Sequence, residues 1–115
     1  MRATIGAFAL LAHGVQVFDN DSHPTDAAAR EAHSRAILAG EREQAAAVEA
    51  APVSIGARAW IGLNSFVGKG VTVGEGSIVA AGSVVTRDVP PHSLAAGNPA
   101  RVVRTLAVLP ETPPV

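Results

Sequence analysis

The sequence predicts an all-β solenoid, a parallel β-helix made of short strands, and a six-residue repeat is the main reason. A β-branched apolar residue stands at every sixth position from residue 55 to residue 85, and a residue that is small or nearly so follows each. The series is Ile55, Ile61, Val67, Val73, Val79 and Val85, followed in turn by Gly56, Gly62, Gly68, Gly74, Ala80 and Thr86. A period of six fits neither a helix nor simple strand alternation, and hexapeptide repeats are a signature of the parallel β-helix.

Stacking explains why the repeat needs these residue types. If a few hexapeptides make one coil, each Ile or Val lies over its counterpart in the next coil, and the columns form a continuous core. Glycine suits the bends because it accepts backbone dihedrals that are closed to β-branched residues. We expect two coils here, residues 55–72 and 73–90.

The N-terminal segment keeps the same spacing, which predicts another coil at residues 5–22. Ile5, Leu11 and Val17 are six residues apart. Arg2 followed by a mostly apolar stretch also imitates a secretory signal peptide. The in-phase repeat favours the coil, so the expected solenoid has about three coils.

The six-residue pattern disappears in an excursion between the first and second coils, residues 23–53. Ala, Glu and Arg are frequent there and favour helix, and Gly40 is a plausible stop. We expect one or two short helical turns in this loop. After Pro90 the chain is expected to leave the coils as a C-terminal tail, residues 91–115, with a loose Pro-rich end. Residues 1–115 are interpreted as a single domain.

Composition excludes several classes of function. The chain has 115 residues, of which 48% are hydrophobic and 3% aromatic, so Val, Ile, Leu and Ala must build the core. A net charge of −1 gives no support to a nucleic-acid partner. With no cysteine there is no disulfide framework, and no apolar run approaches the roughly 20 residues that span a bilayer. We expect a cytoplasmic protein without membrane insertion.

Chemistry is expected in the segment DNDSHPTD, residues 19–26, where the first coil gives way to the excursion. His23 lies among three aspartates there, and an imidazole with a pKa near neutrality can take a proton from a hydroxyl. A carboxylate on its other ring nitrogen would fix the tautomer. The candidates for that carboxylate are Asp19, Asp21 and Glu49, and the sequence does not choose among them.

The other histidines are interpreted differently. His33 and His92 are expected to be structural or exposed, and His13 occupies a bend of the first coil. Ser22 lies in no nucleophile-elbow sequence, and there is no cysteine. We therefore favour direct transfer of a group between two bound substrates over a covalent intermediate on the enzyme.

Residues 53–104, from VSIGARAWIG to GNPARVVR, resemble the C-terminal portion of the hexapeptide-repeat O-acetyltransferases, the family of maltose and galactoside acetyltransferases and of polysaccharide-modifying enzymes. The resemblance implies a left-handed β-helix with three hexapeptides per triangular coil, assembled as a trimer. It implies an acetyltransferase that uses acetyl-CoA as co-substrate and no metal. The histidine-proline step at His23 resembles the place of the family's general base, which acts on a hydroxyl of a sugar-type acceptor. The chain would be an N-terminally short member.

The resemblance also implies the cofactor contacts. Ala81 and Gly82 would lie beside the pantetheine arm with Thr86 close to it, and Arg101 and Arg104 would lie near the phosphates. Small side chains leave the backbone open to an amide-rich arm, and the planar fork of arginine suits phosphate. The alternative is that Ala81 and Gly82 are small only for stacking and that the arginines are merely solvated.

Assembly and two other functions complete the expectations. A thin three-coil prism leaves apolar residues uncovered, which predicts that they pack against another chain. These residues include Phe8, Leu63, Phe66 and Leu94. Together with the resemblance, this packing implies a homotrimer with active sites between subunits. A non-catalytic β-solenoid scaffold remains open as an alternative function. A γ-type carbonic anhydrase, whose zinc would need three protein ligands, is the second alternative.

Overall fold

The computed structural model describes residues 2–41 and 48–108, and these contain one helix and eleven strands. The expected loose end of the tail, residues 109–115, lies outside the described residues. The elements are β1 (Ala3–Ile5), β2 (Leu10–Leu11), β3 (Gln16–Val17), α1 (Ala27–Leu38), β4 (Val53–Ile55), β5 (Trp60–Ile61), β6 (Phe66–Val67), β7 (Thr72–Val73), β8 (Ile78–Val79), β9 (Val84–Val85), β10 (Ser93–Gly97) and β11 (Ala100–Thr105).

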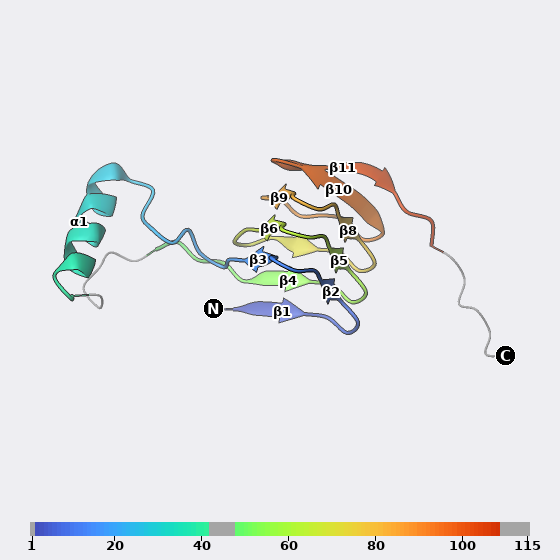
Figure 1. Cartoon of the computed structure of the whole chain (residues 1–115), viewed down its shortest axis with the longest axis horizontal. Helices are drawn as coiled ribbons and strands as arrows, with labels where there is room; N and C mark the ends of the chain where they lie inside the picture. The colour runs from blue at the N-terminus through green and yellow to red at the C-terminus, as the bar shows by residue number, and fades with distance from the viewer. Residues whose placement is uncertain (1, 42–47, 109–115) are drawn as a thin grey trace.

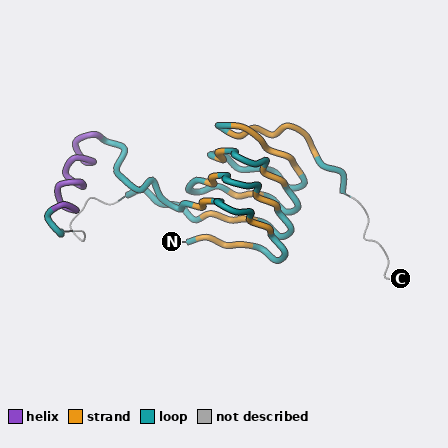
Figure 2. Tube along the Cα trace, in the orientation of Figure 1, coloured by secondary structure: helices purple, strands orange, loops and turns teal. Residues whose placement is uncertain are grey.

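The chain visits three sheets in rotation (Figures 1 and 2). The first sheet holds β1, β4 and β7, the second holds β2, β5, β8, β10 and β11, and the third holds β3, β6 and β9. Ile61 pairs with Val79 and Val67 with Val85, so 18 residues carry the chain once around. Strands stacked in this way are parallel. The predicted parallel β architecture, with an inserted helix, is confirmed.

The core is a set of columns inside the three sheets. All six residues of the repeat between 55 and 85 are at most 1% exposed. A second column is also buried, formed by Ala59, Ser65, Val71, Ser77, Ser83 and Val89. The hydroxyls of its three serines donate hydrogen bonds to backbone carbonyls. Buried hydroxyls cost little when they are bonded in this way.

Gly62 shows why a glycine follows the apolar residue at this point of the repeat. A β-carbon at Gly62 would lie 2.6 Å from the backbone nitrogen of Ala81 and 2.7 Å from the carbonyl oxygen of Val79. Both atoms belong to the backbone of the next circuit and cannot move aside. The stacking distance itself therefore excludes a side chain there.

One end of the stack is open. Ile5 of β1 pairs with Ile55 of β4 in the same inward column, yet Ile5 is 52% exposed and Ile55 is 1% exposed. In the described residues no strand lies on the other side of β1. The N-terminal repeat is thus present, but its column is less buried than the sequence pattern suggests.

The excursion leaves the stack and returns in register. Ile5 and Ile55 are 50 positions apart whereas Ile55 and Val73 are 18 apart, so the insertion adds 32 residues without shifting the pairing. Its helix α1 is longer than the one or two turns expected, because it is capped at both ends. The side chain of Asp26 accepts the N–H of Ala29 at the start, and Gly40, at φ +79°, ends the helix with the hydrogen bonds of a Schellman motif.

The chain does not leave the stack at Pro90, contrary to the prediction for the C-terminal tail. Strand β10 pairs parallel with β8, and β11 turns back to pair antiparallel with β10 (Figure 1). The six-residue spacing is lost after Val85, so the repeat could not reveal these strands. The hairpin gives the edge of β8 a partner, which an otherwise open sheet edge needs.

Candidate active site

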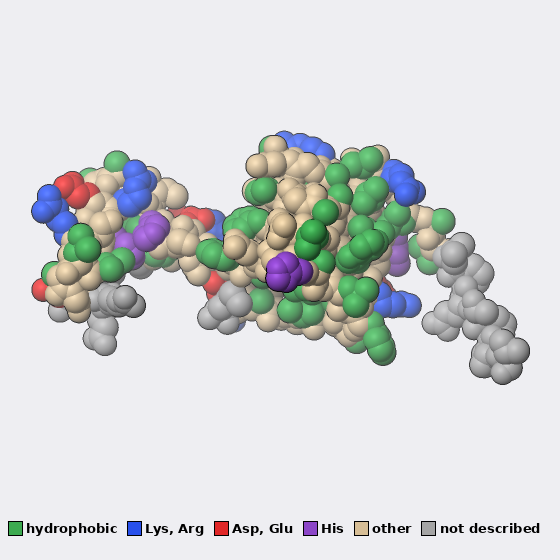
Figure 3. All heavy atoms as spheres, viewed as in Figure 1, with side chains coloured by type: hydrophobic (Ala, Val, Ile, Leu, Met, Phe, Trp, Pro, Cys, Tyr) green, Lys and Arg blue, Asp and Glu red, His purple; other side chains and the backbone are tan. Residues whose placement is uncertain are grey.

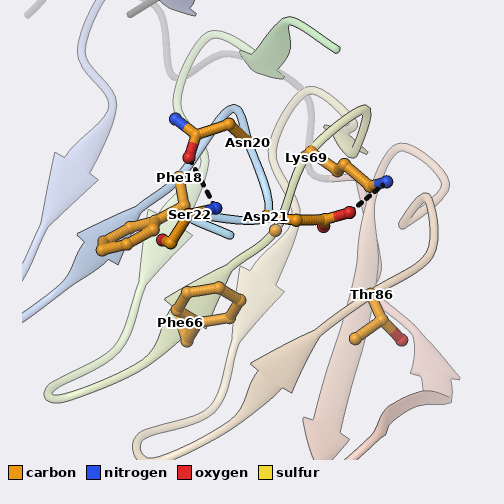
Figure 4. A pocket seen from close by; sticks show the side chains of 8 residues that line it. Phe18, Asn20, Asp21, Ser22, Phe66, Lys69 and Thr86 are labelled. Carbon is orange, nitrogen blue, oxygen red and sulfur yellow. Dashed lines mark hydrogen bonds and ion pairs between the residues drawn. The ribbon is translucent and has the colours of Figure 1, made fainter. Parts of the chain in front are cut away.

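A pocket of about 380 Å³ lies where the strands of the third sheet end (Figure 4). Phe18 follows β3, Lys69 follows β6 and Thr86 follows β9, so three successive circuits contribute to it. The segment that leads into the excursion, residues 20–22, lies at the same corner and supplies more of the lining. The lining residues are Phe18, Asn20, Asp21, Ser22, Phe66, Gly68, Lys69 and Thr86.

The pocket combines an aromatic side with polar groups. The rings of Phe18 and Phe66 lie 5.5 Å apart in a tilted arrangement. Asn20, Ser22 and Thr86 add an amide and two hydroxyls, as Figure 4 shows. Ligand sites in proteins are commonly apolar clefts with a few convergent polar groups, and this pocket has that character.

His23 comes directly after the pocket-lining Ser22 and is exposed. A tight local turn places it there. Ser22 has φ +67°, its N–H donates to the side-chain oxygen of Asn20 at 2.8 Å, and the N–H of His23 donates to the carbonyl of Asp21 at 2.7 Å. A non-glycine residue at positive φ is uncommon and marks a backbone held by its surroundings.

The three carboxylates expected near His23 have other partners. Asp19 is buried and accepts the N–H of Arg2 at 2.7 Å and the amide of Asn20 at 2.8 Å. Those two hydrogen bonds hold the pKa of Asp19 below its ordinary value. Asp21 and Glu49 both bind Lys69. Within the described residues the ring of His23 makes no hydrogen bond, so none of the three orients it.

His33 of α1, not a carboxylate, contacts the ring of His23. The two rings meet edge to face, with centroids 5.3 Å apart and planes at 83°. His33 is the residue of α1 that is buried, which agrees with the structural role expected for it. Its place beside His23 could not be foreseen, because the nine residues between them carry no pattern that specifies how α1 folds back.

The expected cofactor residues fall into two groups in one chain. Thr86 lines the pocket at the corner that leads into the excursion. Ala81 and Gly82 are exposed at the bend between β8 and β9, which is the opposite end of the third sheet. Gly82 has φ +72°, and its N–H donates to the carbonyl of Leu63 at 2.7 Å. One chain therefore does not bring Ala81 and Gly82 together with His23.

Arg101 and Arg104 lie on the same side of β11 only because the pairing is irregular. Arg104 is opposite Leu94 and Arg101 is opposite Ala96, with a register shift between Leu94 and Ala95. Leu94 and Ala96 share one face of β10, and side chains opposite one another share a face. A spacing of three would place the arginines on opposite faces of a regular strand, so the bulge places both on one face of β11.

The remaining histidines lie at other corners. His13 is exposed between β2 and β3, and His92 packs beside Gly76 with φ +51°. In residues 2–41 and 48–108, no three His, Asp or Glu side chains form a group that could hold a metal ion. In the same residues, no helix is long and apolar enough to cross a bilayer.

Comparison with known proteins adds a family to this geometry. Residues 52–87 match the family described as the hexapeptide repeat of succinyl-transferase. The Staphylococcus aureus (strain MRSA252) protein named "Putative acetyltransferase SAR2635" is 57% identical over 58 residues, which are 50% of this chain and 29% of that protein. This chain therefore carries the hexapeptide repeat that the spacing predicted.

Solved structures extend the likeness to almost the whole chain. The hexapeptide-repeat acetyltransferase VCA0836 of Vibrio cholerae O1 biovar eltor, in complex with acetyl coenzyme A, has a TM-score of 0.74 and 36% identity over 92% of this chain and 50% of that one. A maltose O-acetyltransferase of Clostridium difficile 630 has a TM-score of 0.73 and 34% identity over 92% of this chain and 49% of that one. The chain thus spans about half the length of these structures. The resemblance to hexapeptide-repeat acetyltransferases is confirmed in sequence and in fold.

Proposed function

We propose that this chain is the catalytic part of an acetyltransferase that moves the acetyl group of acetyl-CoA to a hydroxyl of a sugar-type acceptor, with His23 as general base. The observation that carries this proposal is the exposed His23, which comes directly after Ser22, a residue that lines the aromatic and polar pocket. The relatives support it, because one is solved with acetyl coenzyme A and another is a maltose O-acetyltransferase.

The chemistry needs one proton acceptor. The neutral imidazole of His23 takes the proton of the acceptor hydroxyl as its oxygen attacks the thioester carbonyl of acetyl-CoA. The tetrahedral intermediate collapses, the carbon–sulfur bond breaks and the acetyl ester remains on the acceptor. The imidazolium then returns its proton to the leaving thiolate, so free CoA departs as the thiol. No covalent enzyme intermediate is required.

The pocket suits a sugar ring. One face of a pyranose presents C–H groups that can pack on Phe18 and Phe66, while its hydroxyls can bond to polar side chains. Asn20, Ser22 and Thr86 provide such groups. The ring contact from His33 would hold the imidazole of His23 edge-on beside the acceptor.

For acetyl-CoA we propose the contacts expected from the resemblance. Exposed Ala81 and Gly82 leave room for the pantetheine arm to approach the backbone. Arg101 and Arg104 share one side of β11 and can receive the phosphates. Thr86 would lie close to the arm at the pocket end. Replacing Arg101 or Arg104 with Ala should weaken CoA binding by about tenfold and dephospho-CoA binding by less.

We also propose a left-handed stack of three coils that assembles as a homotrimer in the cytoplasm, where acetyl-CoA is available. Apolar side chains run down the outer face of the second sheet (Figure 3). They are Leu10, Trp60, Ile78 and Leu94, which stand opposite one another on successive strands. A neighbouring chain would cover this ladder, and would set its Ala81 and Gly82 against His23 of the first chain.

The test of catalysis is His23→Ala, with His13→Ala as a matched control. His13 is also exposed, but it lies on the bend between β2 and β3. CoA release against a panel of sugars should show turnover reduced by a factor of about 10² to 10⁴ in His23→Ala and unchanged in His13→Ala. Near-normal turnover of His23→Ala would contradict the assignment, and a chain that binds no CoA would be a scaffold instead.

The test of shared sites is a mixture of two impaired variants. His23→Ala chains and Arg101→Ala chains should regain part of the activity when they assemble together, since some interfaces then combine an intact histidine with an intact arginine. Light scattering should give three times the monomer mass. A monomer that turns over acetyl-CoA at the same rate would refute the intersubunit site.

A further inference from the structure

Lys69 joins three passages of the chain at the corner beside the pocket. Its Nζ lies 2.9 Å from Oδ2 of Asp21 and 2.9 Å from Oε2 of Glu49. Asp21 belongs to the segment that leaves the stack and Glu49 to the segment that returns, while Lys69 follows β6 within the stack. Figure 4 shows the ammonium group meeting the carboxylate of Asp21 across the rim of the pocket.

The segments that lead into and out of the excursion, residues 19–22 and 49–51, are called its two arms here, and they also bond to each other at this point. The N–H of Asp21 donates to the carbonyl of Glu49 at 3.1 Å, and the N–H of Ala51 donates to the carbonyl of Asp19 at 2.8 Å. The N–H of Gly70, next to Lys69, donates to the carbonyl of Ala51 at 3.0 Å. Lys69 therefore lies over a short antiparallel ladder at the base of the excursion.

The same residue that Lys69 binds also holds the backbone of His23. The carbonyl of Asp21 accepts the N–H of His23 at 2.7 Å, through the turn in which Ser22 has φ +67°. A movement of Asp21 away from the stack would therefore carry His23 with it. The position of the imidazole relative to the pocket depends on where this turn is anchored.

The positive charge of Lys69 favours this contact. The hydrogen bonds that Lys69 donates to Asp21 and Glu49 raise the pKa of Lys69 above its ordinary value, so the group remains an ammonium ion. The side chain of Lys69 is 30% exposed and that of Glu49 is 76% exposed. Ion pairs whose side chains are this exposed to solvent contribute little to the global stability of the fold. The expected effect of Lys69 is therefore on the conformation of the turn at Ser22.

We propose that Lys69 is a positioning residue, which clasps the two arms of the excursion to the stack and thereby fixes the backbone of His23, directly after the pocket-lining Ser22. This inference rests on the proposed function. Lys69 does not touch the reacting atoms in the mechanism above, and its effect passes through Asp21. The stack offers a matched comparison in the exposed ion pair between Arg58 and Glu75, which lies at a different corner.

The kinetic test compares Lys69→Met, Lys69→Arg and the control Glu75→Gln. Lys69→Met should lower kcat by about tenfold to a hundredfold, because a small misplacement of a catalytic group is costly, and should leave the KM for acetyl-CoA within about twofold. Lys69→Arg, which keeps two donors for the two carboxylates, should retain most of the activity. Glu75→Gln should match the parent chain. Equal kcat in Lys69→Met and the parent would overturn the proposal.

A second measurement does not depend on activity. Amide hydrogen exchange followed by NMR should be faster at Asp21 and Ala51 in Lys69→Met, and unchanged at Gly62 in the stack. If the parent chain transfers no acetyl group, the proposed function fails while exchange still tests the clasp. If the parent is active and exchange at Asp21 and Ala51 is unchanged, the clasp is wrong and the function stands.

Discussion

Two isoleucines of one column provide a quantitative test of the stacked core. Ile55 and Ile5 are paired across β4 and β1 and point to the same interior, but Ile55 is 1% exposed and Ile5 is 52% exposed. Truncating a fully buried isoleucine to alanine costs about 2 to 5 kcal/mol, because transfer free energy is lost and a cavity remains. A half-exposed isoleucine loses only about half of a burial term of roughly 1.5 to 3 kcal/mol and leaves no closed cavity.

We therefore expect Ile55→Ala to lower the free energy of unfolding by about 3 kcal/mol and Ile5→Ala by about 1 kcal/mol. Urea unfolding followed by circular dichroism and by the fluorescence of Trp60, the single tryptophan, measures both. Protein concentration must be fixed, because association shifts apparent stability. Equal losses in the two variants would show that the end of the stack at β1 is covered in solution, and would refute this reasoning.

Three further changes test the bends, the buried carboxylate and the histidine pair. Gly62→Ala should unfold at markedly lower urea than Gly68→Ala, since a β-carbon at Gly62 meets backbone at 2.6 Å whereas at Gly68 the nearest atom is 3.3 Å away on a side chain. The pKa of Asp19 is lowered from an ordinary 3.8, so the ionised carboxylate stabilises the fold above that pH, and this contribution is lost as the pH falls through the folded pKa. The loss of stability caused by Asp19→Asn at pH 7 should therefore shrink below about pH 4. A loss that stays constant with pH would contradict this role of Asp19. His33→Ala should lower kcat with little change in acetyl-CoA KM, and His33→Phe should restore it because a ring again meets His23 edge-on; equal rates in both variants would remove that role.

Much of the stack could be predicted from the sequence because its structure repeats locally. Each apolar residue of the series returns after six positions, and several of the residues that follow it must fit against the backbone of the next circuit. Gly62 and Ile61 illustrate this, since burial of one and close approach at the other follow from the same stacking distance. The buried serines Ser65, Ser77 and Ser83 recur in the sequence at multiples of six. Only the structure shows that their hydroxyls donate to backbone carbonyls, which explains why a hydroxyl is tolerated in the core.

The candidate site could be predicted only in part. His23 stands out in the sequence because of its acidic neighbours and the proline that follows it. Lys69 carried no signal, since a lysine in a bend is ordinary, and its partners Asp21 and Glu49 are 48 and 20 positions away. The carboxylate expected to orient His23 was sought among Asp19, Asp21 and Glu49, but these groups hold the base of the excursion.

The sequence by itself determined the period, the parallel stacking and the histidine on which the chemistry is proposed to depend, because each follows from neighbours within a few residues along the chain. The tertiary structure decided which groups meet across long separations. It placed His33 against His23, set Lys69 between two arms of the excursion, and brought Arg101 and Arg104 to one face through a bulge. These depend on how an irregular insertion and a hairpin return to the stack, and an irregular backbone leaves no period in the sequence from which its contacts can be inferred.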